Sequence, residues 1–448
     1  MNYIFNDDFI LRFEFFGGLL YSPMNSDIYI VKNEDAVFLD CIKCGYARDD
    51  AIKIVNKYFN FEYVPNIDDM LENEIIHEKT EKISSTILNI ETEIEKYKKI
   101  LNEAKKRNYL SSPIEVSIYP SSFCQLNCKF CYFSTKRNNY KNFISINKWL
   151  KLIDELKNNS VIYLSILGGE PTIYPHIDEI LQYVDKIKFK TTITTNGLDI
   201  KKSTFDIICK SKYITPTISI QSLDEYNLKY MGVSSVKIIK TIKEFVKNGK
   251  IPRLNSVIYK QSEKEIYEMI DFCADLGIEE YALNIYMPLG NDLKSNHDFN
   301  YYKELDYKVQ EYISKKKYND LHVSMQGCLL YSAYYNECEN PVDSEFDKII
   351  YGCEAGQTKV EIMPDGTMIP CTAFKLDDFI YDNVFKVPFE YAWNNSKCLK
   401  ALRNYKIKDD KCVKCKYSNF CNGGCPAYNI RKNKSLVEKG DERCQVVL

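Results

Sequence analysis

Three cysteines in one short stretch are the residues of this chain best suited to chemistry. Cys124, Cys128 and Cys131 have the spacing C-x3-C-x2-C, and Tyr132 follows directly. Iron–sulfur clusters usually take four cysteines, so a compact loop that offers three leaves one iron free to bind another ligand. The alternatives are a structural zinc site and unrelated buried thiols. Zinc motifs mostly repeat a two-residue gap and need a fourth ligand, and none of the 4 histidines lies near, so we favour a cluster.

A second motif, Gly168-Gly169-Glu170-Pro171, follows the apolar strand candidate Val161–Leu167. Two glycines let the backbone approach a ligand closely, and the carboxylate can accept a hydrogen bond from an ammonium group. Alone, the motif is only a turn signal. Its position after a strand that follows the cysteine loop makes it a candidate ligand site.

Polar side chains end the next two strand candidates. Thr195 and Asn196 close the first, and Ser219 and Gln221 close the second. Ordinary capping of strand ends explains these residues as well as a binding site does. The elements that bring the strand ends together therefore decide between the two interpretations.

From Pro113 onward, strands and helices alternate. The strand candidates are Ile114–Ile118, Val161–Leu167, Lys190–Thr195, Thr217–Gln221, Pro252–Tyr259 and Tyr281–Tyr286. The helix candidates are Ser145–Asn158, His176–Val184, Lys202–Lys210, Val236–Asn248, Ser262–Leu276 and Tyr301–Lys315. Six such units predict an α/β fold, a partial (β/α)6 barrel of parallel strands. In such barrels the chemistry lies at the C-terminal ends of the strands, where both motifs fall.

The C-terminal third is rich in cysteine. Seven thiols follow one another there: Cys353, Cys371, Cys412, Cys415, Cys421, Cys425 and Cys444. A zinc ribbon also uses C-x2-C pairs and is the alternative to cluster ligation. Pro364-Asp365-Gly366 predicts a hairpin turn that brings Cys353 and Cys371 together.

Residues 1–85 predict a small module of their own. Leu11–Tyr21 alternates partly and then turns at two glycines, and Asp27–Val31 is a second strand candidate. Ala36–Leu39 begins a third strand or a helix, and Asp50–Phe59 has helical spacing. Strands followed by helices suit a winged-helix-like shape. The amphipathic stretch Ser85–Asn108 predicts a helix, which we interpret as the linker to the next domain.

The composition excludes several classes of protein. Lys and Arg number 60 against 62 Asp and Glu, so no global field points to nucleic acid or membrane. No apolar run is long enough to span a membrane, and the start lacks the pattern of a secretory signal. Without such a signal, 17 cysteines favour metal or cluster ligation over disulfides. These thiolates need a reducing cytoplasm.

The cysteine loop and the Gly168–Pro171 motif together resemble the signature of the radical S-adenosylmethionine (SAM) superfamily. The resemblance implies a 4Fe–4S cluster on Cys124, Cys128 and Cys131, with SAM on the open iron. It also implies an aromatic residue at the position of Tyr132 and contacts from the Gly-Gly-Glu-Pro motif to the SAM amino group.

The same resemblance suggests further SAM contacts. By position, four strand-end residues look like the family's contacts to the SAM ribose and carboxylate: Thr195, Asn196, Ser219 and Gln221. One departure stands out, because the family often places an arginine before the glycine that here is Gly232, and this chain has Met231. Lys229 and Arg253 are candidates to replace that arginine, and Asn255 is a further polar candidate.

The seven later thiols resemble the SPASM extension of radical SAM enzymes that modify peptides and proteins, which holds two auxiliary iron–sulfur clusters. The family's crossed arrangement assigns to the distal cluster Cys412, Cys415, Cys421 and Cys444. It assigns to the proximal cluster Cys353, Cys371 and Cys425. Cys338, Cys328 or an open iron that binds a substrate thiolate would complete the proximal site. Thr372 stands where sulfatase-maturing relatives have an acidic base, which weakens that interpretation.

The pattern around Phe16–Tyr21 resembles the precursor-peptide recognition element of enzymes that modify ribosomal peptides, with a plain capping domain as the alternative. Such modules bind an extended leader peptide at a sheet edge. The expected domains are a recognition module (1–85), a linker helix (86–112), a radical SAM core (113–320) and a SPASM domain (321–448).

Together these resemblances imply an enzyme that uses SAM and three 4Fe–4S clusters to form thioether cross-links in a cysteine-rich precursor peptide, as sactipeptide and ranthipeptide maturases do. The alternatives are carbon–carbon cross-linking of a peptide and sulfatase-type maturation. Outside enzymes, the alternative is an iron–sulfur electron carrier or a peptide-binding scaffold. The expected partners are the precursor peptide and an electron donor such as flavodoxin or ferredoxin, without nucleic acid or membrane. The sequence names no catalytic side chain.

Overall fold

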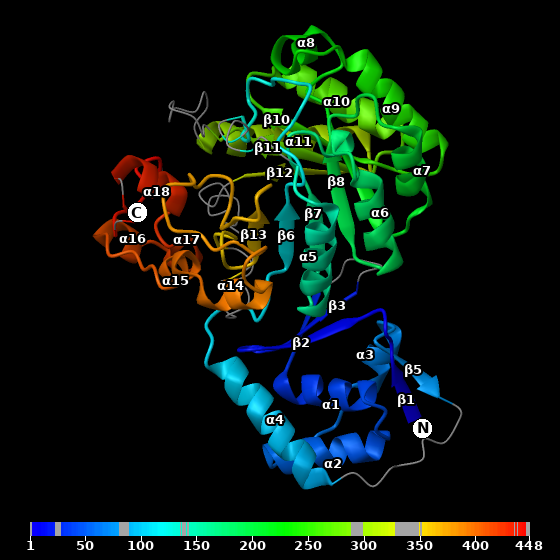
Figure 1. Ribbon diagram of the computed structural model, residues 1–448, viewed down its shortest axis with the longest axis vertical. Helices are drawn as coiled ribbons and strands as arrows, with labels where there is room; N and C mark the ends of the chain where they lie inside the picture. The colour runs from blue at the N-terminus through cyan, green and yellow to red at the C-terminus, as the bar shows by residue number, and fades with distance from the viewer. Residues whose placement is uncertain are drawn as a thin grey trace. The chain divides into compact units, whose positions relative to one another are not determined.

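The structure is a computed structural model. It describes residues 2–22, 28–79, 89–134, 136, 140, 143–287, 299–327, 349, 352–433, 435–436 and 438–444. The chain divides into two compact units, Met1–Pro113 and Ile114–Leu448 (Figure 1). None of the described helices combines the length and the apolar composition that crossing a membrane requires.

The first unit contains two small antiparallel sheets. In one, β2 (Ile10–Glu14), β3 (Gly17–Tyr21) and β4 (Ile28–Val31) pair in that order. In the other, β1 (Asn2–Phe5) pairs with β5 (Ile76–Lys79). The sequence analysis placed a turn at Gly17 and Gly18, but both glycines belong to β3. A Cβ on Gly18 would lie 2.6 Å from the Val31 side chain, so this glycine allows close packing.

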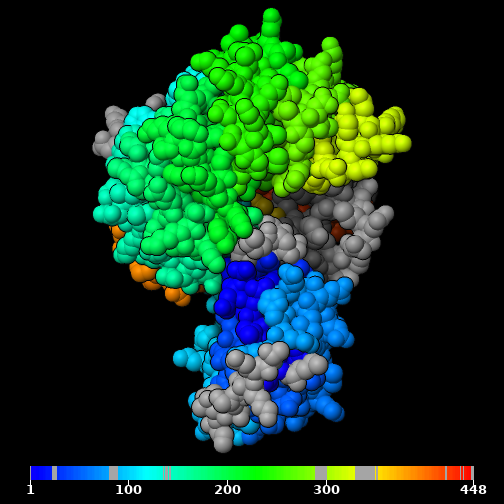
Figure 2. Space-filling model, turned by 90° about the vertical axis from the view of Figure 1, so that its right-hand side faces the viewer, coloured from blue at the N-terminus to red at the C-terminus, as the bar shows by residue number. Residues whose placement is uncertain are grey.

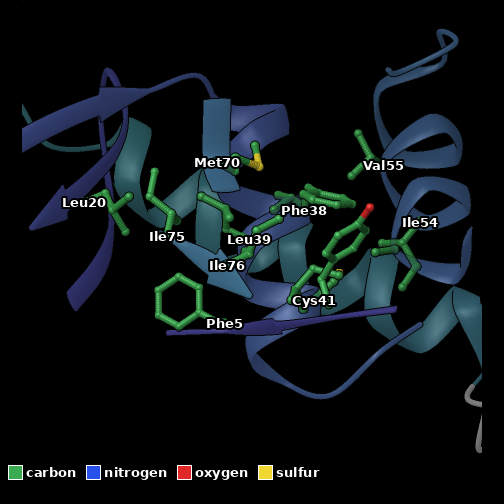
Figure 3. Close-up of a cluster of buried hydrophobic side chains, with 14 of the residues drawn as sticks. Phe5, Leu20, Phe38, Leu39, Cys41, Ile54, Val55, Met70, Ile75 and Ile76 are labelled. Carbon is green, nitrogen blue, oxygen red and sulfur yellow. The ribbon is translucent and has the colours of Figure 1, made fainter. Parts of the chain in front are cut away.

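Helices α1 (Asn33–Lys43), α2 (Arg48–Phe59) and α3 (Ile67–Glu72) complete the unit. Residues 36–39, left open between strand and helix, lie in α1. Figure 3 shows side chains from β1, β3, β5 and these helices converging on one apolar core, which includes Phe5, Leu20, Phe38, Ile54, Met70 and Ile76. The apolar residues of α1 are buried because one helix face turns to this core.

Helix α4 (Ile90–Lys105) corrects the interpretation of residues 86–112 as a linker. Tyr97 and Leu101 on α4 belong to the apolar core of the first unit. The Tyr97 hydroxyl donates to Asp40 Oδ2 at 2.9 Å, and Lys96 pairs with the same carboxylate at 3.1 Å. The helix is therefore packed into this unit along its length.

The second unit is built on a sheet with the order β12-β11-β10-β9-β8-β7-β6-β13-β14 among the described residues. The six predicted strands are β6 (Glu115–Ile118), β7 (Tyr163–Ile166), β8 (Thr191–Thr195), β9 (Ile214–Ser219), β10 (Arg253–Ile258) and β11 (Glu280–Ile285). They are parallel throughout. Their isoleucines are buried, since β-branched side chains pack well on a pleated surface. The predicted α/β partial barrel is confirmed.

The sheet continues beyond the six predicted strands at both ends. β12 (His322–Gln326) pairs with β11, and β13 (Lys359–Ile362) pairs with β6, both in parallel. β14 (Met368–Ile369) pairs antiparallel with β13. Between them Gly366 has a φ of +88°, as the predicted hairpin turn requires. Residues after 320, assigned to a separate extension, therefore supply strands to the barrel sheet.

Helices follow the strands and cover the sheet. They are α5 (Ile146–Asn158), α6 (Ile177–Lys186), α7 (Lys202–Lys210), α8 (Glu225–Met231), α9 (Ser235–Lys247), α10 (Glu263–Asp275) and α11 (Phe299–Lys316). In the space-filling view of Figure 2, the green surface belongs to the part of the chain that contains α7 to α10. Ser262 and Glu265 form a capping box at the start of α10, which satisfies backbone N–H groups that a helix start leaves free.

The C-terminal part contains short helices and turns. They are α14 (Phe389–Asn395), α15 (Lys397–Arg403), α16 (Asp410–Val413), α17 (Ser418–Cys421) and α18 (Pro426–Asn433). Phe374, Cys398, Ala427 and Ile430 form a small apolar core there. Cysteines stand at or beside the ends of α16, α17 and α18, so these short elements position thiols.

Candidate active site

A cavity of about 770 Å³ opens at the carboxyl ends of the barrel strands. Thr195, Ser219 and Ile285, the last residues of β8, β9 and β11, line it. Cysteines from two distant parts of the sequence also line it: Cys124, Cys128, Cys131, Cys353, Cys371 and Cys425. The end of the barrel thus joins two cysteine patterns that lie more than 200 residues apart in the chain.

The loop 124–131 is held by hydrogen bonds of its own backbone and of α8. The Leu126 N–H donates to Cys124 Sγ at 3.4 Å. The Lys129 N–H donates to the carbonyl of Tyr230 at 2.9 Å. All three thiols of the loop are partly exposed, and they face one cavity. Three thiols presented together in a pocket fit an iron–sulfur cluster that keeps one iron for a further ligand.

The glycines of the second motif allow a close approach between two backbone segments. Gly168 has a φ of +147°, and a Cβ there would lie 2.5 Å from the Ser121 carbonyl oxygen. On Gly169 a Cβ would lie 2.1 Å from the Phe123 carbonyl oxygen. Both glycines also line the cavity. They let the backbone fit against the segment that leads into the cysteine loop, and their close approach to a ligand stays a prediction.

Glu170 is buried, with 1% of its surface exposed. Its Oε1 accepts hydrogen bonds from the Thr172 and Thr195 hydroxyls, both at 2.7 Å. Its Oε2 accepts from the Asn196 N–H at 2.8 Å. Burial raises the pKa of Glu170, and these donors partly offset that rise. The carboxylate therefore fastens the end of β8, and its contact with the SAM amino group stays a prediction.

Asn196 connects this carboxylate to the cysteine loop. Its Nδ2 donates to Cys124 Sγ at 3.9 Å. Its Oδ1 accepts from the Leu198 N–H at 3.0 Å and from Gln125 Nε2 at 3.4 Å. Two donors on the oxygen set the orientation of the amide, so its nitrogen faces the thiol.

Four more of the predicted site residues line the cavity: Tyr132, Ser219, Gln221 and Asn255. The Tyr132 hydroxyl lies 3.4 Å from that of Tyr119. Gln221 is 2% exposed, and its Oε1 accepts from the Val257 N–H at 2.8 Å. Pro171 is buried and begins the short 3-10 helix η2 (Pro171–Ile173), so it turns the chain after Glu170.

Arg253 is not brought to the cavity. It is the first residue of β10 and therefore lies at the amino end of the strand, away from the carboxyl ends that form the site. Its guanidinium Nε lies 3.0 Å from Glu280 Oε2. This position contradicts the prediction that Arg253 holds the SAM carboxylate. Met231, in contrast, does line the cavity.

Cys353, Cys371 and Cys425, assigned to the proximal cluster, lie together on the cavity wall. Burial raises the pKa of Cys371 well above its ordinary value, and the charges of Glu361, Cys425 and Cys353 raise it further. Thiols that raise one another's pKa are held close, and binding to iron would relieve their repulsion. The fourth-ligand candidates, Cys328 and Cys338, lie outside the described residues.

Cys412, Cys415, Cys421 and Cys444 form a second group. Burial is the main cause that raises the pKa of Cys412, and Cys444 and Cys415 add to it. Burial raises the pKa of Cys421 to about 12, with smaller contributions from Cys444 and Cys412. That these four cysteines hold the distal cluster stays a prediction. The described residues contain no group of three His, Cys, Asp or Glu side chains arranged for a single metal ion.

Three buried charged residues near Cys371 were missed by the sequence analysis. Glu361 on β13 is 5% exposed and accepts from the Tyr119 hydroxyl at 2.7 Å. Lys136 and Arg431 bind the backbone carbonyls that directly follow Cys371. No local motif marks these residues, because only the tertiary structure brings them together.

Comparisons with known proteins agree with this geometry. Residues 118–291 match the model of the radical SAM superfamily, and residues 353–416 match that of an iron-sulfur cluster-binding domain, SPASM. The crystal structure of Streptococcus suis SuiB bound to precursor peptide SuiA is 33% identical, with a TM-score of 0.86, and the match covers 99% of this chain and 100% of that chain. A structure of SuiB bound to S-adenosylmethionine matches with 32% identity and a TM-score of 0.84, covering 99% of this chain and 100% of that chain.

The antilisterial bacteriocin subtilosin biosynthesis protein AlbA of Bacillus subtilis is 25% identical over 73% of this chain and 70% of its own length. The chain therefore belongs to the radical SAM superfamily and to its branch with a SPASM domain, enzymes whose cofactors are S-adenosylmethionine and iron–sulfur clusters.

Proposed function

We propose that this enzyme cross-links two residues of a ribosomally made precursor peptide and forms a carbon–carbon bond. Thioether formation, the leading expectation from the sequence, becomes the second candidate. The observation that carries the proposal is the single cavity onto which Cys124, Cys128 and Cys131 open together with Cys353, Cys371 and Cys425. A peptide segment in that cavity would touch both cysteine groups.

The donor sets fit the cofactors that the family uses. Three thiols of the core loop would hold a 4Fe–4S cluster with one iron free for SAM. When bound there, SAM and the cluster supply a radical that removes a hydrogen atom from the substrate. A volume of about 770 Å³ lies within the usual range for ligand sites of roughly 300–1,000 Å³. The cavity is therefore large enough for a ligand of the size of SAM.

The chain's own residues would position these groups. Glu170 holds Asn196 by its backbone N–H, and Asn196 donates to Cys124. Ser219 and Asn255 add polar groups at the strand ends for the ribose and carboxylate of SAM. The cavity walls also contain apolar side chains such as Val257 and Met325, which exclude water from a reactive substrate.

The comparisons favour carbon–carbon cross-linking over thioether formation. SuiB, which is bound to a precursor peptide in its structure, matches nearly the whole chain. The subtilosin biosynthesis protein matches a smaller share at lower identity. Thr372 in place of an acidic residue after Cys371 continues to disfavour sulfatase-type maturation.

The proposed enzyme also needs auxiliary clusters, a site for the leader peptide and an electron donor. Two auxiliary clusters, one on each later cysteine group, bring the total to three. The first unit would bind the leader of the precursor peptide along β4, which among the described strands pairs on one side only, with β3. A backbone edge of this kind can add one more strand. A flavodoxin or ferredoxin in a reducing cytoplasm would supply the electron that starts each reaction.

The test takes as candidate precursors any short peptides encoded beside this gene and incubates them anaerobically with reconstituted enzyme, SAM and a reductant. We expect 5′-deoxyadenosine and a peptide that has lost two hydrogens per cross-link. Alkylation with iodoacetamide then separates the candidates, because a thioether removes a free thiol and a carbon–carbon bond does not. The control is the enzyme with alanine at Cys124, Cys128 and Cys131. A peptide of unchanged mass, despite SAM cleavage, would contradict the proposal.

A further inference from the structure

Lys136 is a buried lysine beside the proximal cysteines. It is 4% exposed, and its Nζ donates to the carbonyl oxygen of Thr372 at 2.6 Å. Thr372 directly follows Cys371. Among the described residues, no carboxylate lies within ion-pair distance of Lys136. Its side chain therefore brings a positive charge from just after the core cysteine loop to the turn that carries Cys371.

Arg431 places a second cation at the same turn. It lies on α18, is 9% exposed, and its Nη2 donates to the carbonyl oxygen of Ala373 at 2.6 Å. The same helix begins one residue after Cys425. The two cations thus bind consecutive backbone carbonyls, Thr372 and Ala373, and approach the cysteine group from two different elements.

Burying a cation away from water is unfavourable unless a negative charge or several acceptors compensate it. Cys371 is a charge neighbour of Lys136 and of Arg431, and Cys425 is a neighbour of Arg431. Glu361 and Asp378 also face Lys136. Thiolates of Cys353, Cys371 and Cys425 would add the negative charge that two buried cations favour, because Coulomb interactions are strong in a low-dielectric interior.

We propose that Lys136 and Arg431 are positioning residues that raise the reduction potential of a cluster held by Cys353, Cys371 and Cys425. Positive charge near the site stabilises the reduced form, which carries one more negative charge than the oxidised form. This inference rests on the proposed function in taking the three cysteines as ligands of a proximal cluster. It goes further by naming the residues that make this site an electron acceptor.

The role fits the proposed reaction. After a hydrogen atom is removed, closing a bond between two peptide residues requires the loss of one further electron and one proton from the peptide. The electron would pass to the proximal site, which is then reduced by one electron, and the proton would pass to solvent. Two buried cations at that site favour the transfer over return of the electron to the peptide.

The experiment measures potential, without SAM or peptide, so its failure is distinct from a failure of the proposed function. The full chain carries alanine at Cys124, Cys128 and Cys131, so that clusters can form only at the auxiliary sites. Its reconstituted clusters are titrated potentiometrically with detection by electron paramagnetic resonance. Replacement of Cys412 and Cys415 by alanine identifies which signal belongs to the distal site.

We expect Lys136→Met and Arg431→Met each to lower the reduced-to-oxidised ratio of the proximal signal about tenfold at the parent's midpoint, a shift of about 59 mV for a one-electron couple. Lys136→Arg, which keeps the charge, retains the parent value. The matched control is Lys432→Met, since Lys432 is the exposed neighbour of Arg431 and pairs with Glu442 at 3.0 Å.

Iron content and circular dichroism establish that each variant is folded and loaded. If one methionine variant loses its proximal iron, the proximal potential of the other variant decides the test. An unchanged proximal potential in a loaded Lys136→Met or Arg431→Met variant would overturn the inference. An equal shift in the Lys432→Met control would also overturn it, because the effect would then not depend on burial.

Discussion

The carboxamide nitrogen of Asn196 lies 3.9 Å from the sulfur of Cys124 and donates a hydrogen bond to it. Hydrogen bonds to cluster sulfurs raise the reduction potential, because they stabilise added negative charge. We expect Asn196→Ala to lower the reduced-to-oxidised ratio of the core cluster about threefold at the parent's midpoint, or about 0.7 kcal/mol, within the range for one hydrogen bond. A redox titration without SAM measures this.

The matched control is Asn248→Ala. Asn248 follows α9 in the same unit, and its side chain donates to the backbone carbonyl of Glu244, away from the cavity-lining residues. A core potential that responds equally to both substitutions would contradict a specific role for Asn196.

Gly169→Ala should remove iron from the core site. The added Cβ would lie 2.1 Å from the Phe123 carbonyl oxygen, so the backbone before the cysteine loop must move. Forcing a group into a packed region typically costs about 1–3 kcal/mol. Iron analysis should show loss from the core site with the auxiliary iron retained. Gly277→Ala is the control. It strains a backbone with a φ of +67°, but nothing lies within 4 Å of its Cβ position, so it should keep all its iron.

The buried carboxyl of Glu170 predicts a pH dependence. Burial raises the pKa of Glu170 in the folded protein, so folding favours the protonated form. The contribution of this group to stability is therefore present at low pH and is lost as the pH rises from about 4.3, the ordinary value, through the raised pKa. Glu170→Gln removes this trend. Between pH 4 and pH 7, the iron-free variant should therefore gain stability relative to its iron-free parent.

Thermal unfolding at several pH values measures the difference in stability between variant and parent. Glu103→Gln should show the opposite trend, because the neighbouring Lys106 lowers the pKa of Glu103. A pH-independent difference for Glu170→Gln would argue that the carboxylate gains as much from its donors as it loses by burial.

A buried ion pair lies in the first unit. Arg12 Nη2 lies 2.7 Å from Glu14 Oε1, and Glu14 Oε2 also accepts from the Ser111 N–H at 2.7 Å. Glu14→Ala leaves the Arg12 charge buried without this partner and should cost about 3–5 kcal/mol in unfolding free energy. The double replacement of Arg12 and Glu14 by methionine should cost clearly less. Chemical denaturation of the full chain compares them, and equal losses would refute the charge argument.

The local chemistry of this enzyme could be predicted from the sequence. The spacing of Cys124, Cys128 and Cys131 and the alternation of strands and helices depend on neighbours a few residues apart, and such patterns survive without knowledge of the fold. The division of the later thiols between two clusters was implied by the family's pattern and stays a prediction.

The sequence misled where a residue's role depends on which end of an element it occupies. Arg253 lies on the expected strand, yet it begins β10 and so lies away from the carboxyl ends. The glycines at 168 and 169 line the cavity, but they also allow a close approach to the backbone of Ser121 and Phe123, which lies more than 40 residues earlier. Neither feature can be seen in a local pattern.

What the sequence alone determined is the set of donors and the class of reaction, since thiol spacing and strand ends select the cofactors. Only the tertiary structure decided that two cysteine groups share one cavity. It also decided that Lys136 meets the backbone of Thr372 across 236 residues of chain. The physical reason is that the potential at a site depends on every buried charge nearby in space, and sequence distance carries no information about that field.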